Sequence, residues 1–202
     1  MDENIIVKSA QGFNCVSLDA RLLSKRLIYI DNKEITGDLI AVVIKKIMAL
    51  ILEDENKTIT IVLDSPGGSV KAGMALYDLL QSSKTPIKMV VIGRAYSMAA
   101  ILFAAGKNGR YMLPNSEIMI HEPVLGDSIS GNAAHVNSIT DKLNKEKKLL
   151  NHILSKHTGK TEKQIEKEMS YDHFFTADEA VKFGICDKVI DFDKIMEDII
   201  NE

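Results

Sequence analysis

Residues 87–106 constrain the fold of this chain more than any other stretch. Residues 87–92 form a short β-branched run that indicates a buried strand, and residues 98–105 form a run of small and apolar side chains that indicates a helix packed on all sides. Ser97 stands at the turn between them. A serine at such a turn is either the N-cap of the helix, which is a common use of serine, or a nucleophile.

Strand and helix patterns alternate along the rest of the chain. Strands are predicted at residues 27–30, 58–63, 87–92, 111–113 and 118–120, and helices at residues 39–53, 70–81, 98–105 and 132–157. Two capping boxes predict short helices after Thr161 and Thr176, and Gly184 is placed to end the second. The alternation predicts the α/β class with a largely parallel sheet and right-handed crossovers, and 202 residues suit one such domain.

The two ends of the chain carry weaker patterns. Residues 1–25 show only weak alternation and are interpreted as a mobile arm, and residues 191–202 as an acidic helical tail. Residues 123–131 contain proline and glycine, which predicts an extended loop or an edge segment. Residues 186–190 predict a closing strand or turn.

Composition argues against several classes of function. The formal net charge of −3 provides no electrostatic reason to bind nucleic acid or an anionic membrane. Cys15 and Cys186 lack the spacing of a metal site and fit a reducing compartment. The longest apolar run, residues 39–52, is interrupted by two lysines and is too short to span a bilayer. The first residues are acidic, unlike a secretory signal, so we expect a cytoplasmic protein.

The absence of other motifs narrows the chemistry further. The sequence contains neither G-x-x-x-x-G-K-[ST] nor G-x-G-x-x-G, so neither ATP nor NAD is implied. Ser97 lies outside any G-x-S-x-G elbow, and no S-x-x-K pair is present. His121-Glu122 begins like H-E-x-x-H, but residue 125 is leucine, so a zinc protease is not supported.

Two loops are candidates for a binding site, because ligands of open α/β sheets bind beyond the carboxyl ends of the strands. Residues 65–68, Ser-Pro-Gly-Gly, and residues 94–97, Arg-Ala-Tyr-Ser, each follow a predicted strand. If the two strands are neighbours, the amides of Gly68 and Met98 can converge on one oxygen, which is an oxyanion hole in outline. The alternative for Pro-Gly-Gly is an ordinary tight turn.

A serine nucleophile needs a base, and histidine is the usual one. Of five histidines, three lie on the predicted helix at 132–157 and His173 lies in a polar segment. His121 ends a predicted strand, where a base can be held near the rim, although a structural histidine is the alternative there. Spacing does not choose the carboxylate that would orient it, and Asp64, Asp172 and Asp187 all remain candidates.

Four groups of motifs, in the same order, resemble the ClpP family of proteolytic subunits of the ATP-dependent Clp protease. They are DSPGGS (64–69) with AGMALY (72–77), SMAA (97–100) within residues 93–100, IMIHEP (118–123), and DHFFTADEA (172–180) with Phe183-Gly184. The resemblance runs from about residue 21 to residue 190, which is most of the chain.

The resemblance implies a serine endopeptidase that works through an acyl-enzyme. It implies a catalytic triad of Ser97, His121 and Asp172, with oxyanion amides at Gly68 and Met98. It also implies substrate contacts at a set of residues near the rim: Ser69, Val124, Leu125 and Gly126. Residues 124–130 would be a strand that pairs with substrate by β-addition.

The resemblance also implies an architecture and partners. The fold would consist of the repeated β-β-α units of ClpP and the crotonases, with a protruding handle helix at about residues 132–157. Residues 1–20 would form an N-terminal arm or axial loop, and residues 21–202 a single peptidase domain. Heptameric rings would meet through the handles in a tetradecamer, fed with unfolded polypeptides by an AAA+ ATPase. We expect no cofactor, no metal, no nucleic acid and no membrane.

The sequence departs from the family pattern at several positions. They are Arg94, Tyr96 and Ala99 around Ser97, Glu122 and Tyr171 where the family has Gln and Arg, and Thr60 and Val62 in place of outer-face aromatic residues. Two alternatives to an ordinary peptidase follow. One is a low-activity or regulatory subunit of a mixed ring, and the other is a crotonase-type acyl-CoA enzyme.

Overall fold

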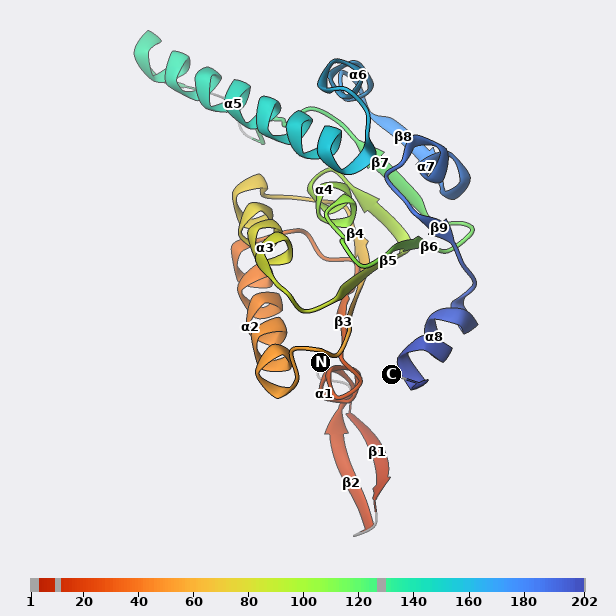
Figure 1. Ribbon diagram of the computed structural model, residues 1–202. Coiled ribbons are helices and arrows are strands. Elements are labelled where there is room, and N and C mark those ends of the chain that lie inside the picture. Colours follow the sequence, from red (N-terminus) through yellow and green to blue (C-terminus); the bar gives the residue numbers. More distant parts are fainter. Residues whose placement is uncertain (1–3, 10–11, 127–129, 202) are drawn as a thin grey trace.

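A mostly parallel sheet is the centre of the fold (Figure 1). The computed structural model describes residues 4–9, 12–126 and 130–201, and in this part of the chain the sheet has seven strands. They are β3 (Leu27–Ile30), β4 (Ile59–Ser65), β5 (Ile87–Tyr96), β6 (Arg110–Met112), β7 (Glu117–Ile120), β8 (His173–Thr176) and β9 (Lys188–Val189). The order is β3-β4-β5-β6-β9, and β7 pairs with both β5 and β8. Within this seven-stranded sheet only the β7–β8 pair is antiparallel, so the predicted α/β class with a largely parallel sheet is confirmed.

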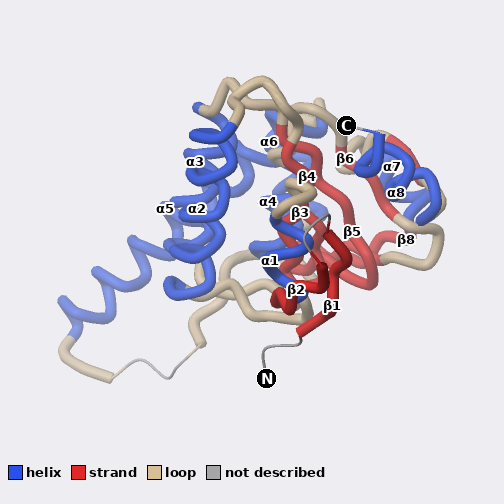
Figure 2. The backbone as a smooth tube through the Cα atoms, turned by 90° about the horizontal axis from the view of Figure 1, so that it is seen from below, coloured by secondary structure: helices blue, strands red, loops and turns tan. Residues whose placement is uncertain are grey.

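Helices cover the two faces of this sheet unequally (Figures 1 and 2). The larger layer consists of α2 (Gly37–Glu53), α3 (Val70–Ser82), α4 (Met98–Ala104) and the end of α5 (Ala133–Thr158), and the opposite face carries α8 (Phe192–Asn201). Strand β4 contacts the helices on both faces, because successive side chains of a strand point to opposite faces of the sheet. Ile61 and Leu63 enter the main core, whereas Val62 packs with Ile195 and Ile199 of α8.

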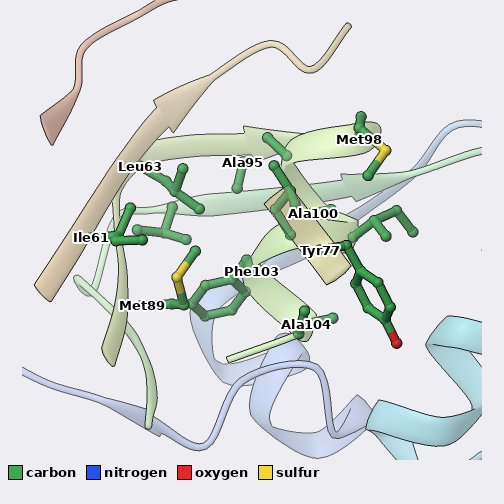
Figure 3. Packing of buried hydrophobic residues seen from close by; sticks show 14 of the residues in the cluster. Ile61, Leu63, Tyr77, Met89, Ala95, Met98, Ala100, Phe103 and Ala104 are labelled. Atoms are coloured by element: carbon green, nitrogen blue, oxygen red, sulfur yellow. The ribbon is translucent and has the colours of Figure 1, made fainter. Parts of the chain in front are cut away.

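Helix α4 is the centre of the main core (Figure 3). All seven of its residues are buried, as the run of small and apolar side chains predicts. Ala100 and Ala104 leave room for close neighbours, and Phe103 is among the largest fully buried side chains of the chain. The start of this helix, which carries Ser97, is therefore held by packing on every side.

The N-terminal segment has more regular structure than the sequence predicts. The segment interpreted as a mobile arm contains an antiparallel hairpin of β1 (Asn4–Ser9) and β2 (Gly12–Ser17), followed by α1 (Leu18–Leu23). The first four residues of β2 are all exposed, and no residue of the hairpin is fully buried among those described. An alternating pattern is weak in such a strand, so the sequence does not specify the hairpin.

Helix α5 extends away from the sheet, in agreement with the predicted handle (Figures 1 and 2). Its buried residues begin only at Leu150, and the preceding turns carry exposed or half-buried side chains. Two short helices follow, α6 (Glu162–Glu168) and α7 (Ala177–Phe183). Both start at the predicted capping boxes, and α7 ends at Gly184 with a φ of 96°. The predicted protruding helix and the short helices are therefore confirmed.

Each helix in the described ranges is either too short or too polar to pass through a bilayer.

The environment of His157 on α5 makes the stability of the fold sensitive to acid. Its Nε2 lies 3.1 Å from the Tyr77 hydroxyl, and burial lowers its pKa from the ordinary value of 6.5 to about 4. Between these two values the unfolded chain binds a proton at this residue that the folded chain does not, so the free energy of unfolding should decrease as the pH falls through that window. One proton sets a ceiling of about 1.4 kcal/mol per pH unit. Solvent screening of this half-buried ring keeps the slope below the ceiling.

Urea unfolding between about pH 7 and about pH 4 tests this expectation on the wild-type protein and His157→Gln. Glutamine keeps a polar partner for Tyr77 but does not titrate. The variant should therefore lose less stability than the wild-type protein as the pH is lowered. Equal pH slopes would show that His157 does not contribute to the acid sensitivity.

Candidate active site

The two predicted loops do meet at one edge of the sheet. Strands β4 and β5 are parallel neighbours, and Ser65 pairs with Ala95 near their carboxyl ends. The predicted boundary of β5 is wrong, however, because residues 94–96 belong to the strand. β5 changes partner along its length: residues 89–91 pair with β6, and residues 94–96 pair with β7. The glycine and the arginine at the change of partner, with a φ of 83° at Gly93, conceal this continuation in the sequence.

Ser97 does not act as a side-chain cap of α4. It occupies the N-cap position, but its side chain makes no capping hydrogen bond, and its φ of 54° and ψ of −121° lie outside the usual regions for a serine. Its backbone N–H donates to Met119 O at 2.8 Å, which fixes the turn. Its Oγ lies 2.8 Å from Nε2 of His121. A strained backbone that aims a hydroxyl at an imidazole is a feature of functional sites.

His121 is placed by strand β7, which it directly follows. Its side chain is 19% exposed, and its Nδ1 lies 3.3 Å from Oδ1 of Asp172, whose side chain is 64% exposed. Asp172 directly precedes β8, and the antiparallel pairing of Ile120 with His173 brings the two residues together. Each nitrogen of the His121 ring therefore faces one polar partner, the hydroxyl on one side and the carboxylate on the other.

The other two carboxylate candidates lie elsewhere. Asp64 has its Oδ1 3.8 Å from Nε of Arg94, and Asp187 pairs with Arg110. Among the three candidates that spacing left open, only Asp172 has a carboxylate close to His121, so the geometry favours Asp172.

The glycine turn lies directly against Ser97. A Cβ on Gly67 would be 2.6 Å from Tyr96 O, 2.7 Å from Ser97 Cβ and 3.2 Å from Met98 N, so only glycine permits this approach. The next residue, Gly68, has a φ of 142°. A Cβ on Gly68 would lie 2.6 Å from Ile35 O, so this position also requires glycine. No hydrogen bond of the described residues uses the amide of Gly68 or of Met98. Met98 directly follows Ser97, and Gly68 directly follows the glycine that contacts Ser97, so neither predicted oxyanion amide is occupied by a hydrogen bond of the described residues.

The predicted substrate-binding residues have mixed surroundings. Ser69 caps α3, since its side chain accepts from Ala72 N at 3.3 Å. Val124 and Leu125 are exposed, and a Cβ on Gly126 would meet nothing within 4 Å. Residues 124–126 belong to no strand, and residues 127–129 of the predicted strand lie outside the described residues.

The remaining histidines lie in other surroundings. Those on α5 are at its ends or contact neighbouring elements: His135 is exposed, His152 contacts Glu162 at 2.8 Å, and His157 contacts Tyr77. His173 has its Nδ1 2.7 Å from Glu168 and is stacked between the rings of Tyr171 and Phe175.

Sequence reasoning missed a charged cluster just behind the site. Lys147 on α5 has its Nζ 2.7 Å from Glu122 and 3.1 Å from Glu166. Hydrogen bonds to these two carboxylates raise the pKa of Lys147. The backbone N–H of Glu122 also donates to Met169 O at 2.8 Å. The segment after His121 is thereby tied to α5 and α6, which no local pattern could indicate.

In the described part of the chain, no group of three or more His, Cys, Asp or Glu side chains is arranged to hold a metal ion.

A comparison with known families yields a match over nearly the whole chain. The family model described as Clp protease matches residues 10–193. This range includes Ser97, His121 and Asp172, the glycine turn and all of α5.

Proposed function

Because this chain belongs to the Clp protease family, we propose that it is a serine endopeptidase in which Ser97 is the nucleophile, His121 the general base and Asp172 the residue that orients the base. Family membership supports a ClpP-like peptidase rather than an acyl-CoA enzyme of the crotonase type. One observation carries the assignment of residues: Oγ of an uncapped, strained Ser97 lies 2.8 Å from Nε2 of His121.

The proposed reaction follows from this geometry. Nε2 of His121 takes the Ser97 proton as Oγ attacks the scissile carbonyl carbon, and later returns the proton to the leaving amine. The resulting acyl-enzyme is released by a water molecule that His121 activates in turn. Asp172, at 3.3 Å from Nδ1, favours the tautomer that leaves Nε2 free to accept the proton.

The oxyanion of the tetrahedral intermediate would be held by the amides of Gly68 and Met98. Gly68 follows Gly67, which lies directly against Ser97, and Met98 provides the first amide of the buried helix α4. Donors fixed before the reaction need no reorganisation when charge develops, and losing one typically costs about 3 kcal/mol of barrier.

We propose that substrate lies in an extended form along residues 124–126 beside the site. Val124 and Leu125 are exposed, and their backbone is not part of the sheet. An extended peptide added to such a segment gains main-chain hydrogen bonds without a requirement for its sequence, which suits unfolded polypeptides as substrates. Ser69, at the start of α3, would border the same space as a further substrate contact.

We also propose the assembly that the family implies. Residues 21–202 would be one peptidase domain and residues 1–20 an axial arm, with seven-membered rings paired through α5 in a tetradecamer. The long exposed part of α5 supports such a contact. An AAA+ ATPase would feed the barrel. An apolar groove of about 580 Å³ on the α8 side of the sheet, lined by Tyr29, Val62 and Phe192 among others, supports a docking site for it.

Intact-mass measurement after treatment with a fluorophosphonate tests the proposed nucleophile. The assembled protein should gain one adduct per chain, and peptide mapping should place it on Ser97, because only a hydroxyl activated by a base reacts at a useful rate. Sedimentation of the same sample should show seven-membered rings or pairs of them. No adduct on assembled protein would refute the peptidase, and a stable monomer would refute the barrel.

A further inference from the structure

Tyr96, the residue before Ser97, makes side-chain contacts with two neighbouring strands of the sheet close to the candidate active site. Its hydroxyl donates a hydrogen bond to the carboxylate of Glu117. Its ring meets the ring of Phe174 edge to face, with centroids 5.6 Å apart and an interplanar angle of 88°. These contacts link three strands, since Tyr96 ends β5, Glu117 begins β7 and Phe174 lies in β8.

The same three strands carry the proposed catalytic residues. Ser97 directly follows β5, His121 directly follows β7, and Asp172 directly precedes β8. Met119 pairs with both Tyr96 and Phe174, so the three residues form one row across the sheet. This row lies within two positions of each catalytic residue along the chain.

We propose that Tyr96 is a positioning residue, whose hydrogen bond to Glu117 and ring contact with Phe174 hold strands β5, β7 and β8 in the register that aligns the catalytic side chains. The inference rests on the proposed peptidase function. It concerns a position at which this chain departs from the family pattern, since Tyr96 is one of the departures around Ser97.

Strand β8 is where such support is most needed. It has only four residues and pairs with β7 alone among the described strands. Asp172 at its start is 64% exposed and lies 3.3 Å from His121, at the long end of the hydrogen-bond range. A catalytic group must be held within about 0.5 Å of its working position, and an exposed carboxylate on a short edge strand has few contacts of its own to do this.

The cluster is built to persist at neutral pH. A phenol is protonated at neutral pH, and the hydrogen bond to Glu117 raises the pKa of Tyr96 further, so the hydroxyl remains a donor into the alkaline range. The Arg94 guanidinium lies 5.6 Å from the centre of the Tyr96 ring and donates to Asn32 at 2.8 Å. The cation over the Tyr96 ring adds a second contact to the one that this ring makes with Phe174.

Steady-state kinetics and crystal structures of Tyr96→Phe test the proposal, since this change removes the hydroxyl and keeps the ring. With a short fluorogenic peptide, kcat should fall by about tenfold while KM stays within about twofold, because alignment rather than binding is lost. The crystal structure should show longer Ser97–His121 and His121–Asp172 distances than the wild-type protein. Glu117→Gln, which still offers an oxygen to the hydroxyl, should keep at least about half of kcat.

Tyr111→Phe is the matched control, because Tyr111 lies on β6 of the same sheet, and its kinetics should equal those of the wild-type protein. An active enzyme with unchanged kcat in Tyr96→Phe, or unchanged distances in its structure, overturns the positioning role. If the distances lengthen but the wild-type protein hydrolyses no peptide and takes up no fluorophosphonate, the positioning role stands and the proposed function falls.

Discussion

Replacing Ser97 by alanine should lower kcat for peptide hydrolysis by about 10⁵- to 10⁶-fold, the loss typical when a serine nucleophile is removed. The fold should not change, because the Ser97 side chain makes no capping hydrogen bond and its Oγ lies 2.8 Å from Nε2 of His121. Its backbone bond to Met119 O remains possible for alanine. The measurement is hydrolysis of a fluorogenic peptide, with sedimentation of the same sample.

Ser82→Ala is the matched control for this loss of a hydroxyl. Ser82 ends α3 on the surface and bonds to backbone carbonyls of its own helix. This variant should hydrolyse the peptide at the wild-type rate. If Ser97→Ala retains a substantial rate, the nucleophile is another residue and the proposed mechanism is wrong.

Gly67→Ala should damage the site without touching a reacting group. The added Cβ would meet Tyr96 O at 2.6 Å and Ser97 Cβ at 2.7 Å, and the φ of 94° is strained for any residue with a Cβ. Either the turn or Ser97 has to move, and a displacement near 1 Å at a catalytic group costs about 100-fold in rate. We therefore expect kcat/KM to fall by about 100-fold or more, and the rate of fluorophosphonate labelling to fall with it.

Gly37→Ala controls for the substitution itself, because a Cβ on Gly37 at the start of α2 meets nothing within 4 Å. Its activity and melting temperature should stay close to those of the wild-type protein. If Gly67→Ala assembles normally and keeps full activity, the close contact between the glycine turn and Ser97 is not needed for catalysis.

The parts of the fold that were predictable are those specified by local patterns. The run at 87–92 is rich in β-branched residues and the run at 98–105 in small and helix-forming apolar residues, so their composition predicts a strand and a helix, and β5 and α4 follow them. The capping box of Thr161 and Gln164 is a contact between near neighbours in sequence, and the structure contains it. Such features need no knowledge of the tertiary structure.

The parts that were not predictable depend on pairing between distant segments. β8 has four residues, too few for a period to show, and it exists because β7 pairs with it. The choice of Asp172 depends on the same pairing, so spacing left it open. The bond from Tyr96 to Glu117 requires the register of β5 with β7, and the glycine and arginine at 93–94 obscure that register in the sequence.

The antiparallel strand β8 also affects what happens while the chain is being made. Ser97 and His121 leave the ribosome before Asp172, and they cannot be completed as a site until the residues of β8 follow and pair with β7. During synthesis the chain therefore contains the proposed nucleophile and base before the carboxylate proposed to orient the base. In the proposed triad the orienting carboxylate is thus the last member to be made, and the site is complete only once β8 has paired with β7.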